Sequence, residues 1–154
     1  MQFNKVCTIP AAIERLWDFM IDAQAVSGCM PGLEEFREAG QDAFEGRVRI
    51  TVGPVSLRLN GRVAVLERDR ASWTAKMSAE AKDVRIAGDV KAAFTTHLTR
   101  KGDNETELSI ATEAKLLGKL GEFGQSIMKK TADRYLTQFV DNIALALVKG
   151  ADVH

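Results

Sequence analysis

The stretch GRVRITVGPVSLRLNGRVAVLERD, residues 46–69, decides the fold class. On both sides of Gly53-Pro54, apolar residues or glycines alternate with polar and charged residues. A period of two is typical of strands with one buried and one solvated face, and a Gly-Pro pair between two such runs marks a tight turn. The stretch therefore predicts a β-hairpin in an antiparallel sheet.

The period of two extends beyond this hairpin, from residue 33 to residue 116. Residues 100–106 have the composition of a hairpin loop, and residues 82–89 that of a longer connection at the rim of the sheet. The clear alternating runs are residues 44–52, 55–65, 72–81, 92–100 and 106–116. With the strand that should follow the Pro31-Gly32 turn, they predict about six antiparallel strands in this part of the chain.

Helical periods precede this region. Residues 10–22 predict an amphipathic helix with Pro10 at its first position, and residues 23–28 a short further turn of helix ended by Gly28. Residues 2–9, bounded by the proline, are expected to form an opening strand. The apolar face of the first helix has the i, i+3, i+4, i+7 spacing and consists of Ile13, Leu16, Trp17 and Met20.

The last segment returns to a helical period, with one apolar stripe over about seven turns. A stripe of this length must be buried, and the sheet is the large apolar face available to it. We therefore predict one α+β domain over residues 1–154, in which a curved antiparallel sheet wraps a long C-terminal helix. The stripe consists of Leu120, Phe123, Ile127, Met128, Ala132, Tyr135, Phe139, Ile143 and Leu147.

The inner face of this sheet is rich in small residues. One interpretation is that they leave an apolar ligand cavity under the helix. The other is that Phe123, Tyr135 and Phe139 fill the room to normal packing density, and that the glycines merely bend the strands. Both remain open at this stage. The small inward positions are Gly46, Gly61, Ala75, Ala79, Ala92 and Ala114.

Few groups with catalytic chemistry are predicted to face inward. His97 falls between inward positions and should face solvent, and His154 ends the chain, so no histidine is expected inside as a general base. Thr96, Thr112 and Tyr135 are the expected inward polar groups, enough to orient one carbonyl or hydroxyl. A dedicated enzyme is therefore not expected.

The two cysteines, Cys7 and Cys29, lack the spacing of a disulfide framework or a zinc site. Cys29 lies between Gly28 and the Pro31-Gly32 turn without a predicted base beside it. We interpret it as a small half-buried hydrophobe rather than a reactive thiol. No metal or cofactor is expected.

The amino-acid composition limits the classes of partner that are expected. The 154 residues carry 21 basic and 21 acidic side chains, so no global charge favours nucleic acid. The N-terminus lacks the apolar core of a signal peptide, and the longest apolar run, residues 143–148, is far too short to span a bilayer. We expect a cytoplasmic protein.

Three stretches together resemble the CoxG family, which is named after a component of carbon monoxide dehydrogenase and belongs to the START-like or SRPBCC superfamily. They are VSGCMPGLEEF (26–36), the hairpin at 46–69, and GKLGEFGQSIMKKTADRYLTQFVDNI (118–143). The resemblance covers nearly the whole chain. It implies a helix-grip fold, a curved sheet around a long helix with an apolar cavity between them, in agreement with the order of elements derived above.

The resemblance also implies a function: a non-catalytic accessory protein of a molybdenum hydroxylase of the carbon monoxide dehydrogenase type. Such a protein would bind a quinone or lipid-like molecule, assist membrane recruitment of the enzyme, or do both. Gly118, Leu120, Gly121 and Gly124 would shape the cavity mouth, with Met30, Pro31 and Gly32 on the opposing rim. Many members continue past the long helix, whereas this sequence stops at His154, which favours a carrier over a directly anchored protein, with peripheral contact at the inner face of the membrane as an alternative.

Two other functions remain open: an interaction or maturation factor without a ligand, and an enzyme similar to polyketide cyclases. The expected ligand-binding residues combine the inward positions with the resemblance. They are Met30, Trp73, Met77, Phe94, Thr96, Ile110, Thr112, Leu120, Phe123, Ile127 and Tyr135.

Overall fold

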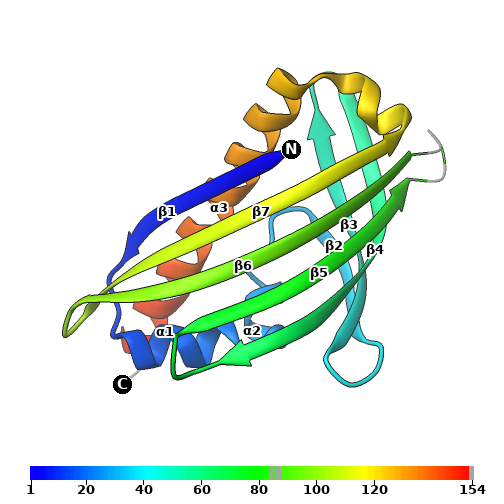
Figure 1. Cartoon of the computed structure of the whole chain (residues 1–154). Helices are drawn as coiled ribbons and strands as arrows, with labels where there is room; N and C mark the ends of the chain where they lie inside the picture. Colours follow the sequence, from blue (N-terminus) through cyan, green and yellow to red (C-terminus); the bar gives the residue numbers. More distant parts are fainter. Residues whose placement is uncertain (84, 86–87, 153–154) are drawn as a thin grey trace.

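The computed structural model describes residues 1–83, 85 and 88–152. Within these residues, seven antiparallel strands form one curved sheet in the order β1-β7-β6-β5-β4-β3-β2 (Figure 1). The strands are β1 (Gln2–Ile9), β2 (Leu33–Glu38), β3 (Ala43–Val52), β4 (Val55–Asp69), β5 (Thr74–Asp83), β6 (Gly88–Gly102) and β7 (Glu105–Gly118). The helices are α1 (Ile13–Met20), α2 (Ala23–Ser27), the 3-10 helix η1 (Lys119–Phe123) and α3 (Gln125–Asp152).

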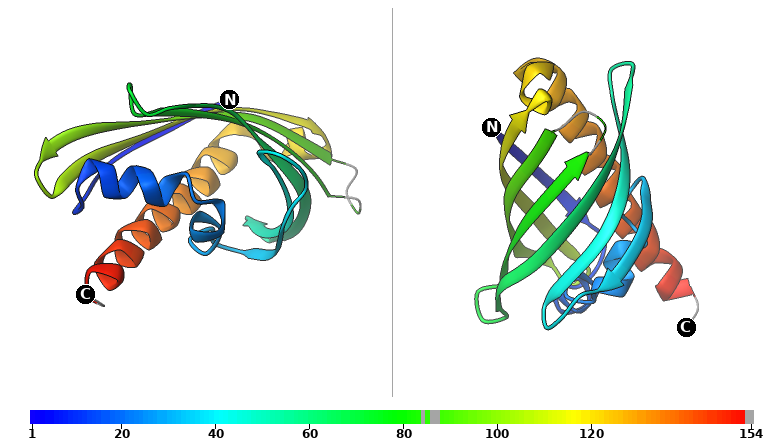
Figure 2. Two further views of the ribbon diagram at one scale, coloured as in Figure 1. Left: turned by 90° about the horizontal axis from the view of Figure 1, so that it is seen from below. Right: turned by 90° about the vertical axis from the view of Figure 1, so that its right-hand side faces the viewer.

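The predicted architecture is confirmed. The sheet bends over α3, and all three α-helices lie on its concave side (Figure 2). The hairpin that decides the fold class is β3–β4, which turns at Gly53 with a φ of 57°. The predicted loop at 100–106 is shorter than expected, because β6 and β7 pair as far as Gly102 and Glu105. The predicted rim connection at 82–89 falls partly outside the described residues.

The start of α1 differs from the prediction. Pro10 lies in a bend before the helix, and Ala12 is the extended N-cap residue, with a ψ of 148°. The bend is closed by Ala11, whose backbone N–H donates to the carbonyl of Ile9 at 2.9 Å. Since β1 continues to Ile9, the chain needs three residues to change direction before α1 can begin.

The predicted continuous stripe at the C-terminus is also interrupted. Leu120 and Phe123 belong to η1, and Gly124, with a φ of 86°, separates η1 from α3. A left-handed backbone conformation of this kind is easily adopted only by glycine. Leu120 packs so closely on Gly88 that a Cβ there would lie 2.4 Å from Leu120 Cγ. Therefore η1 folds back onto the sheet instead of extending α3.

Two apolar clusters form the core, one at each end of the concave face. The first is centred on α1, the C-terminal half of α3 and the ends of β6 and β7, and the second on the β3–β4 hairpin and η1. Burial of such side chains is the main stabilising contribution to the fold. The first cluster includes Ile13, Leu16, Trp17, Leu98, Leu108, Ile110, Ile143 and Leu147; the second includes Val52, Leu57, Leu59 and Leu120.

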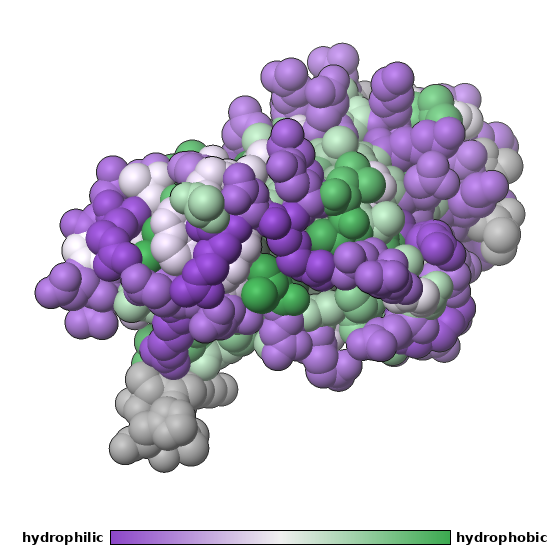
Figure 3. Space-filling model, turned by 60° about the horizontal axis from the view of Figure 1, so that its bottom comes forward, coloured by the Kyte–Doolittle hydropathy of each residue, from purple (hydrophilic) through white to green (hydrophobic). Residues whose placement is uncertain are grey.

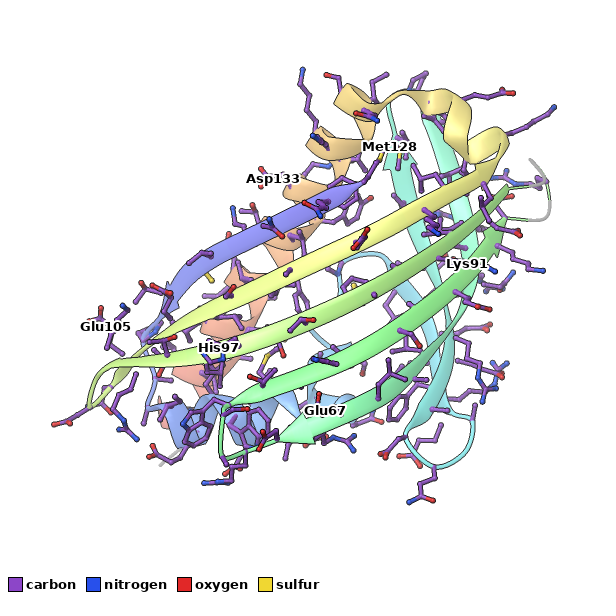
Figure 4. All side chains as sticks on the ribbon, viewed as in Figure 1. Glu67, Lys91, His97, Glu105, Met128 and Asp133 are labelled. Atoms are coloured by element: carbon purple, nitrogen blue, oxygen red, sulfur yellow. The ribbon has the colours of Figure 1, made fainter. Side chains whose placement is uncertain are left out.

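Polar contacts hold α3 across the concave face. Lys5 on β1 forms an ion pair with Asp133 at 3.5 Å, and Figure 4 shows Asp133 beside β1. On the opposite side, the backbone N–H of Thr51 donates to the Tyr135 hydroxyl at 3.0 Å, and the guanidinium of Arg134 donates to the Thr51 carbonyl at 2.7 Å. These contacts tie α3 to β1 on one side and to β3 on the other.

Candidate functional site

A trough of apolar side chains crosses the concave face between the two core clusters. We define the concave trough as Phe44, Val63, Val65, Met77, Ala79, Ala92, Phe94, Thr112 and Ala114. The strand register places these residues in two adjacent rows. One row runs Thr112, Phe94, Met77, Val65 from β7 to β4, and the other runs Ala114, Ala92, Ala79, Val63, Phe44 from β7 to β3.

The middle of the trough consists of small side chains. Ala79, Ala92 and Ala114 face one another across three neighbouring strands. Seven of the nine trough residues are half-buried although they face the helix side of the sheet, and Thr112 and Ala114 are buried. Figure 3 shows apolar patches between the hydrophilic side chains on this side of the molecule. The structure therefore places small, partly buried side chains where the ligand-cavity interpretation expects them.

The trough offers very little polar chemistry. Thr112 is the polar residue among the nine, and it is 8% exposed. Its Oγ1 is buried and has no hydrogen-bond partner. Thr96, one row away, contacts the Ala75 carbonyl at 3.5 Å, and the Tyr135 hydroxyl is used by Thr51. The site is thus suited to an uncharged, mostly apolar molecule.

A second depression, of about 310 Å³, lies beside β2. Met30, which is 45% exposed, lines it together with Leu33 and Phe36. Phe36 stacks on Phe44 of the trough, with 5.5 Å between ring centroids and 17° between ring planes. The predicted rim residue Met30 therefore lies near the trough through this aromatic pair, without belonging to it.

The structure brings together three of the predicted ligand-binding residues, Met77, Phe94 and Thr112. Ile110 is buried in the first cluster next to the trough. The remaining residues lie elsewhere. Trp73 packs edge-on against Trp17 in the first cluster, Leu120 and Phe123 are in the second, Tyr135 contacts Thr51, and Ile127 is 46% exposed.

Several trough residues are missing from the predicted set. Ala79, Ala92 and Ala114 are recognisable in the sequence as small inward residues, whereas Val63 and Val65 are identified only as strand residues. Alternation along one strand shows which side chains share a face. The register between strands, which decides which of them meet, carries no comparable signal in one sequence.

The titratable groups give no catalytic arrangement at the trough. His97 is exposed and contacts Thr74 at 3.1 Å, and Figure 4 shows it on the face of β6 turned away from α3, as predicted. Cys29 is buried, and this burial raises the pKa of its thiol. Cys29 is therefore a core residue, and its low thiolate content makes it a poor nucleophile.

Two other features are absent from residues 1–83, 85 and 88–152. No group of three or more histidine, cysteine or acidic residues is arranged to hold a metal ion there. In the same residues, no helix has both the length and the apolar character needed to cross a bilayer.

Comparison with models of protein families identifies the family to which this chain belongs. The model of the CoxG family, whose description names a component of carbon monoxide dehydrogenase, matches residues 7–148. This chain belongs to the CoxG family. The match includes every strand from β2 to β7 and all of the concave trough. The trough of this CoxG-family protein therefore lies within the region that the family model describes.

Solved structures show the same fold. A conserved protein from Geobacillus kaustophilus matches with a TM-score of 0.88 at 20% identity, covering 97% of this chain and 96% of that one. A START superfamily protein from Mycobacterium smegmatis matches with a TM-score of 0.69 at 11% identity, covering 96% and 97%. The Zhui aromatase/cyclase from Streptomyces sp. R1128 matches with a TM-score of 0.64 at 14% identity, covering 94% and 91%. At these identities the likeness concerns the START-like fold. A comparison with curated proteins finds no match.

Proposed function

We propose that this CoxG-family protein is a non-catalytic accessory protein that carries a hydrophobic molecule, a quinone or a lipid, for a molybdenum hydroxylase of the carbon monoxide dehydrogenase type. The concave trough carries this proposal. Seven of its nine side chains face the helix side of the sheet yet are only partly buried, and an apolar ligand would gain about 25 cal/mol for each Å² of apolar surface removed from water. The family description supports the enzyme partner.

The trough residues also support a binding role over a catalytic one. None of the nine is a histidine, a carboxylate, a lysine or a cysteine, so a proton transfer at the trough would have no side-chain acid or base of ordinary strength. A cyclase-like enzyme shares the fold, but it would have to work here through shape and the Thr112 hydroxyl alone. A factor without ligand would leave the partly exposed apolar side chains of the trough unexplained.

Mass spectrometry of the native protein, purified without detergent and then extracted with organic solvent, tests the carrier role. We expect one bound apolar molecule per chain, released by the extraction and identifiable from its mass. Titration of the extracted protein with a short-chain menaquinone analogue should then saturate at one molecule per chain. If the purified protein contains no bound molecule and does not bind the analogue, the carrier role is excluded.

Assistance in membrane recruitment is a second part of the proposal, supported by the surface around η1. Leu117 and Ile127 are 42% and 46% exposed, and Lys119 lies two positions after Leu117 in the sequence. Lysines near an anionic surface contribute about 1 kcal/mol each. Flotation with vesicles of phosphatidylcholine and phosphatidylglycerol should carry the wild type upward. The double variant Leu117→Ser, Ile127→Ser should bind at least about fivefold less, because its apolar contact is lost.

The matched control for the vesicle measurement is Leu66→Ser. Leu66 is 66% exposed but lies in β4, at the bulge between Val65 and Glu67, away from η1. Its substitution should leave flotation unchanged. Equal losses in both variants, or no flotation of the wild type, would remove the membrane contact from the proposal and leave the carrier role in place.

A further inference from the structure

The hydroxyl of Thr112 is an unsatisfied polar group at the centre of an apolar surface. Thr112 is 8% exposed, and its Oγ1 is buried without a hydrogen-bond partner. Buried polar atoms nearly always have a partner, because an unpaired one costs about 1–3 kcal/mol relative to solvation. A threonine held in this position at such a cost calls for an explanation.

The position of Thr112 in the sheet shows what the hydroxyl could meet. Thr112 pairs with Phe3 on β1 and with Phe94 on β6, so an aromatic residue flanks it on either side on the concave face. Side chains directly opposite each other on neighbouring strands lie within contact distance. The Thr112 hydroxyl therefore lies in an apolar, partly aromatic setting, next to the alanine row of the trough.

The other inward polar groups are already engaged. Thr96 Oγ1 contacts the Ala75 carbonyl at 3.5 Å, and the Tyr135 hydroxyl accepts from the Thr51 N–H at 3.0 Å. The lysine on this side of the sheet, Lys5, is paired with Asp133 at 3.5 Å. Of these groups, Thr112 is the one whose oxygen has no hydrogen-bond partner.

We infer that the trough binds an uncharged, largely apolar molecule through one hydrogen-bonding oxygen, a carbonyl or a hydroxyl, which is recognised by Thr112 Oγ1. This inference rests on the proposed carrier function and specifies the ligand. An anionic head group is disfavoured because none of the nine trough residues is charged. A threonine hydroxyl can donate to a carbonyl or accept from a hydroxyl, so both chemistries fit.

Binding requires a rearrangement of the Thr112 side chain, since Oγ1 itself is covered while other atoms of the residue account for its exposed 8%. A change of staggered rotamer about χ1 exchanges the position of Oγ1 with that of another Cβ substituent. The oxygen would then face the trough. In the absence of ligand the protein bears the cost of the unpaired hydroxyl, and binding relieves it.

The test compares three probes of similar size, farnesol, farnesylacetone and the hydrocarbon farnesane, by titration calorimetry on the extracted full-length protein. Wild type should bind at least one of the two oxygen-bearing probes about tenfold or more tightly than farnesane. Thr112→Val, which keeps the shape and removes the hydroxyl, should abolish this preference. Thr112→Ser, which keeps the hydroxyl, should retain most of it. Farnesol and farnesylacetone distinguish an alcohol ligand from a ketone.

Thermal unfolding without ligand gives an independent readout. Removing an unsatisfied hydroxyl should leave the melting temperature of Thr112→Val unchanged or higher, whereas a structural hydroxyl would make it fall. A lower melting temperature, or an unaltered preference in Thr112→Val, overturns the inference. Equal binding of all three probes by the wild type overturns it too, but leaves the carrier function standing. Failure to bind any probe overturns both.

Discussion

Substitution of Gly32 by alanine should destabilise the protein by about 3 kcal/mol or more, measured as the loss of unfolding free energy in urea. Gly32 has a φ of 81°, a region that costs an L-residue roughly 1–2 kcal/mol. A Cβ on Gly32 would also lie 2.2 Å from the backbone oxygen of Arg49, where no side-chain rotation can relieve the overlap. The turn and β3 would have to separate, weakening the hydrogen bond from Arg49 N–H to the Gly32 carbonyl at 2.8 Å.

Gly53→Ala is the matched control. Gly53 also has a positive φ, 57°, but an added Cβ there meets no atom within 4 Å. It should therefore show only the backbone cost, about 1–2 kcal/mol. The difference between the two variants isolates the contact with Arg49. Equal losses in the two variants would mean that the Gly32 turn is not held against β3 as described.

Most of the fold could be predicted because it rests on local periods. Alternation on both sides of Gly53-Pro54 predicts the β3–β4 hairpin, and the apolar spacing of Ile13, Leu16 and Trp17 predicts the buried face of α1, which the structure confirms. Such patterns are set by the geometry of strands and helices themselves. The order of elements then leaves few ways to bury the C-terminal helix.

The errors occur where tertiary packing overrides a local pattern. Leu120 and Phe123 have the right spacing for the final helix, yet they belong to η1 because Gly124 breaks the helix and Leu120 packs on Gly88. Ile127 also fits the stripe but is 46% exposed, whereas the adjacent Met128 packs against the second cluster. A period shows which residues share a face, and not whether a partner surface lies opposite that face.

The candidate site could be predicted only in part, for the same reason. Met77, Phe94 and Thr112 follow from strand parity, and register then places them in one row. Tyr135 is expected among them because it lies on the apolar stripe. Its hydroxyl instead reaches the free edge of β3 at Thr51, a contact between residues 84 positions apart that no local pattern signals.

Substitution of Ala92 by phenylalanine should abolish most ligand binding while leaving the protein folded. Ala92 lies in the alanine row between Ala79 and Ala114 and is half-buried, so a phenyl ring there would occupy the trough without displacing a packed core. If the ring excludes a ligand from about 100 Å² of contact, the loss is about 2.5 kcal/mol, or roughly fiftyfold or more in affinity. Titration with the short-chain menaquinone analogue measures this change.

The neighbouring Ala93→Phe is the control, because it adds the same side chain to the same strand on the other face. Ala93 is exposed and pairs with Ser78 and Glu113, so its ring would point away from α3 and leave affinity within about twofold of wild type. Under the proposed function, Ala92→Phe should still capture a dehydrogenase of the carbon monoxide dehydrogenase type, because the substitution lies on the concave face and leaves the outer surface unchanged. Loss of capture in Ala92→Phe alone would show that the enzyme recognises the loaded protein, while equal affinities in both variants would place the ligand outside the trough.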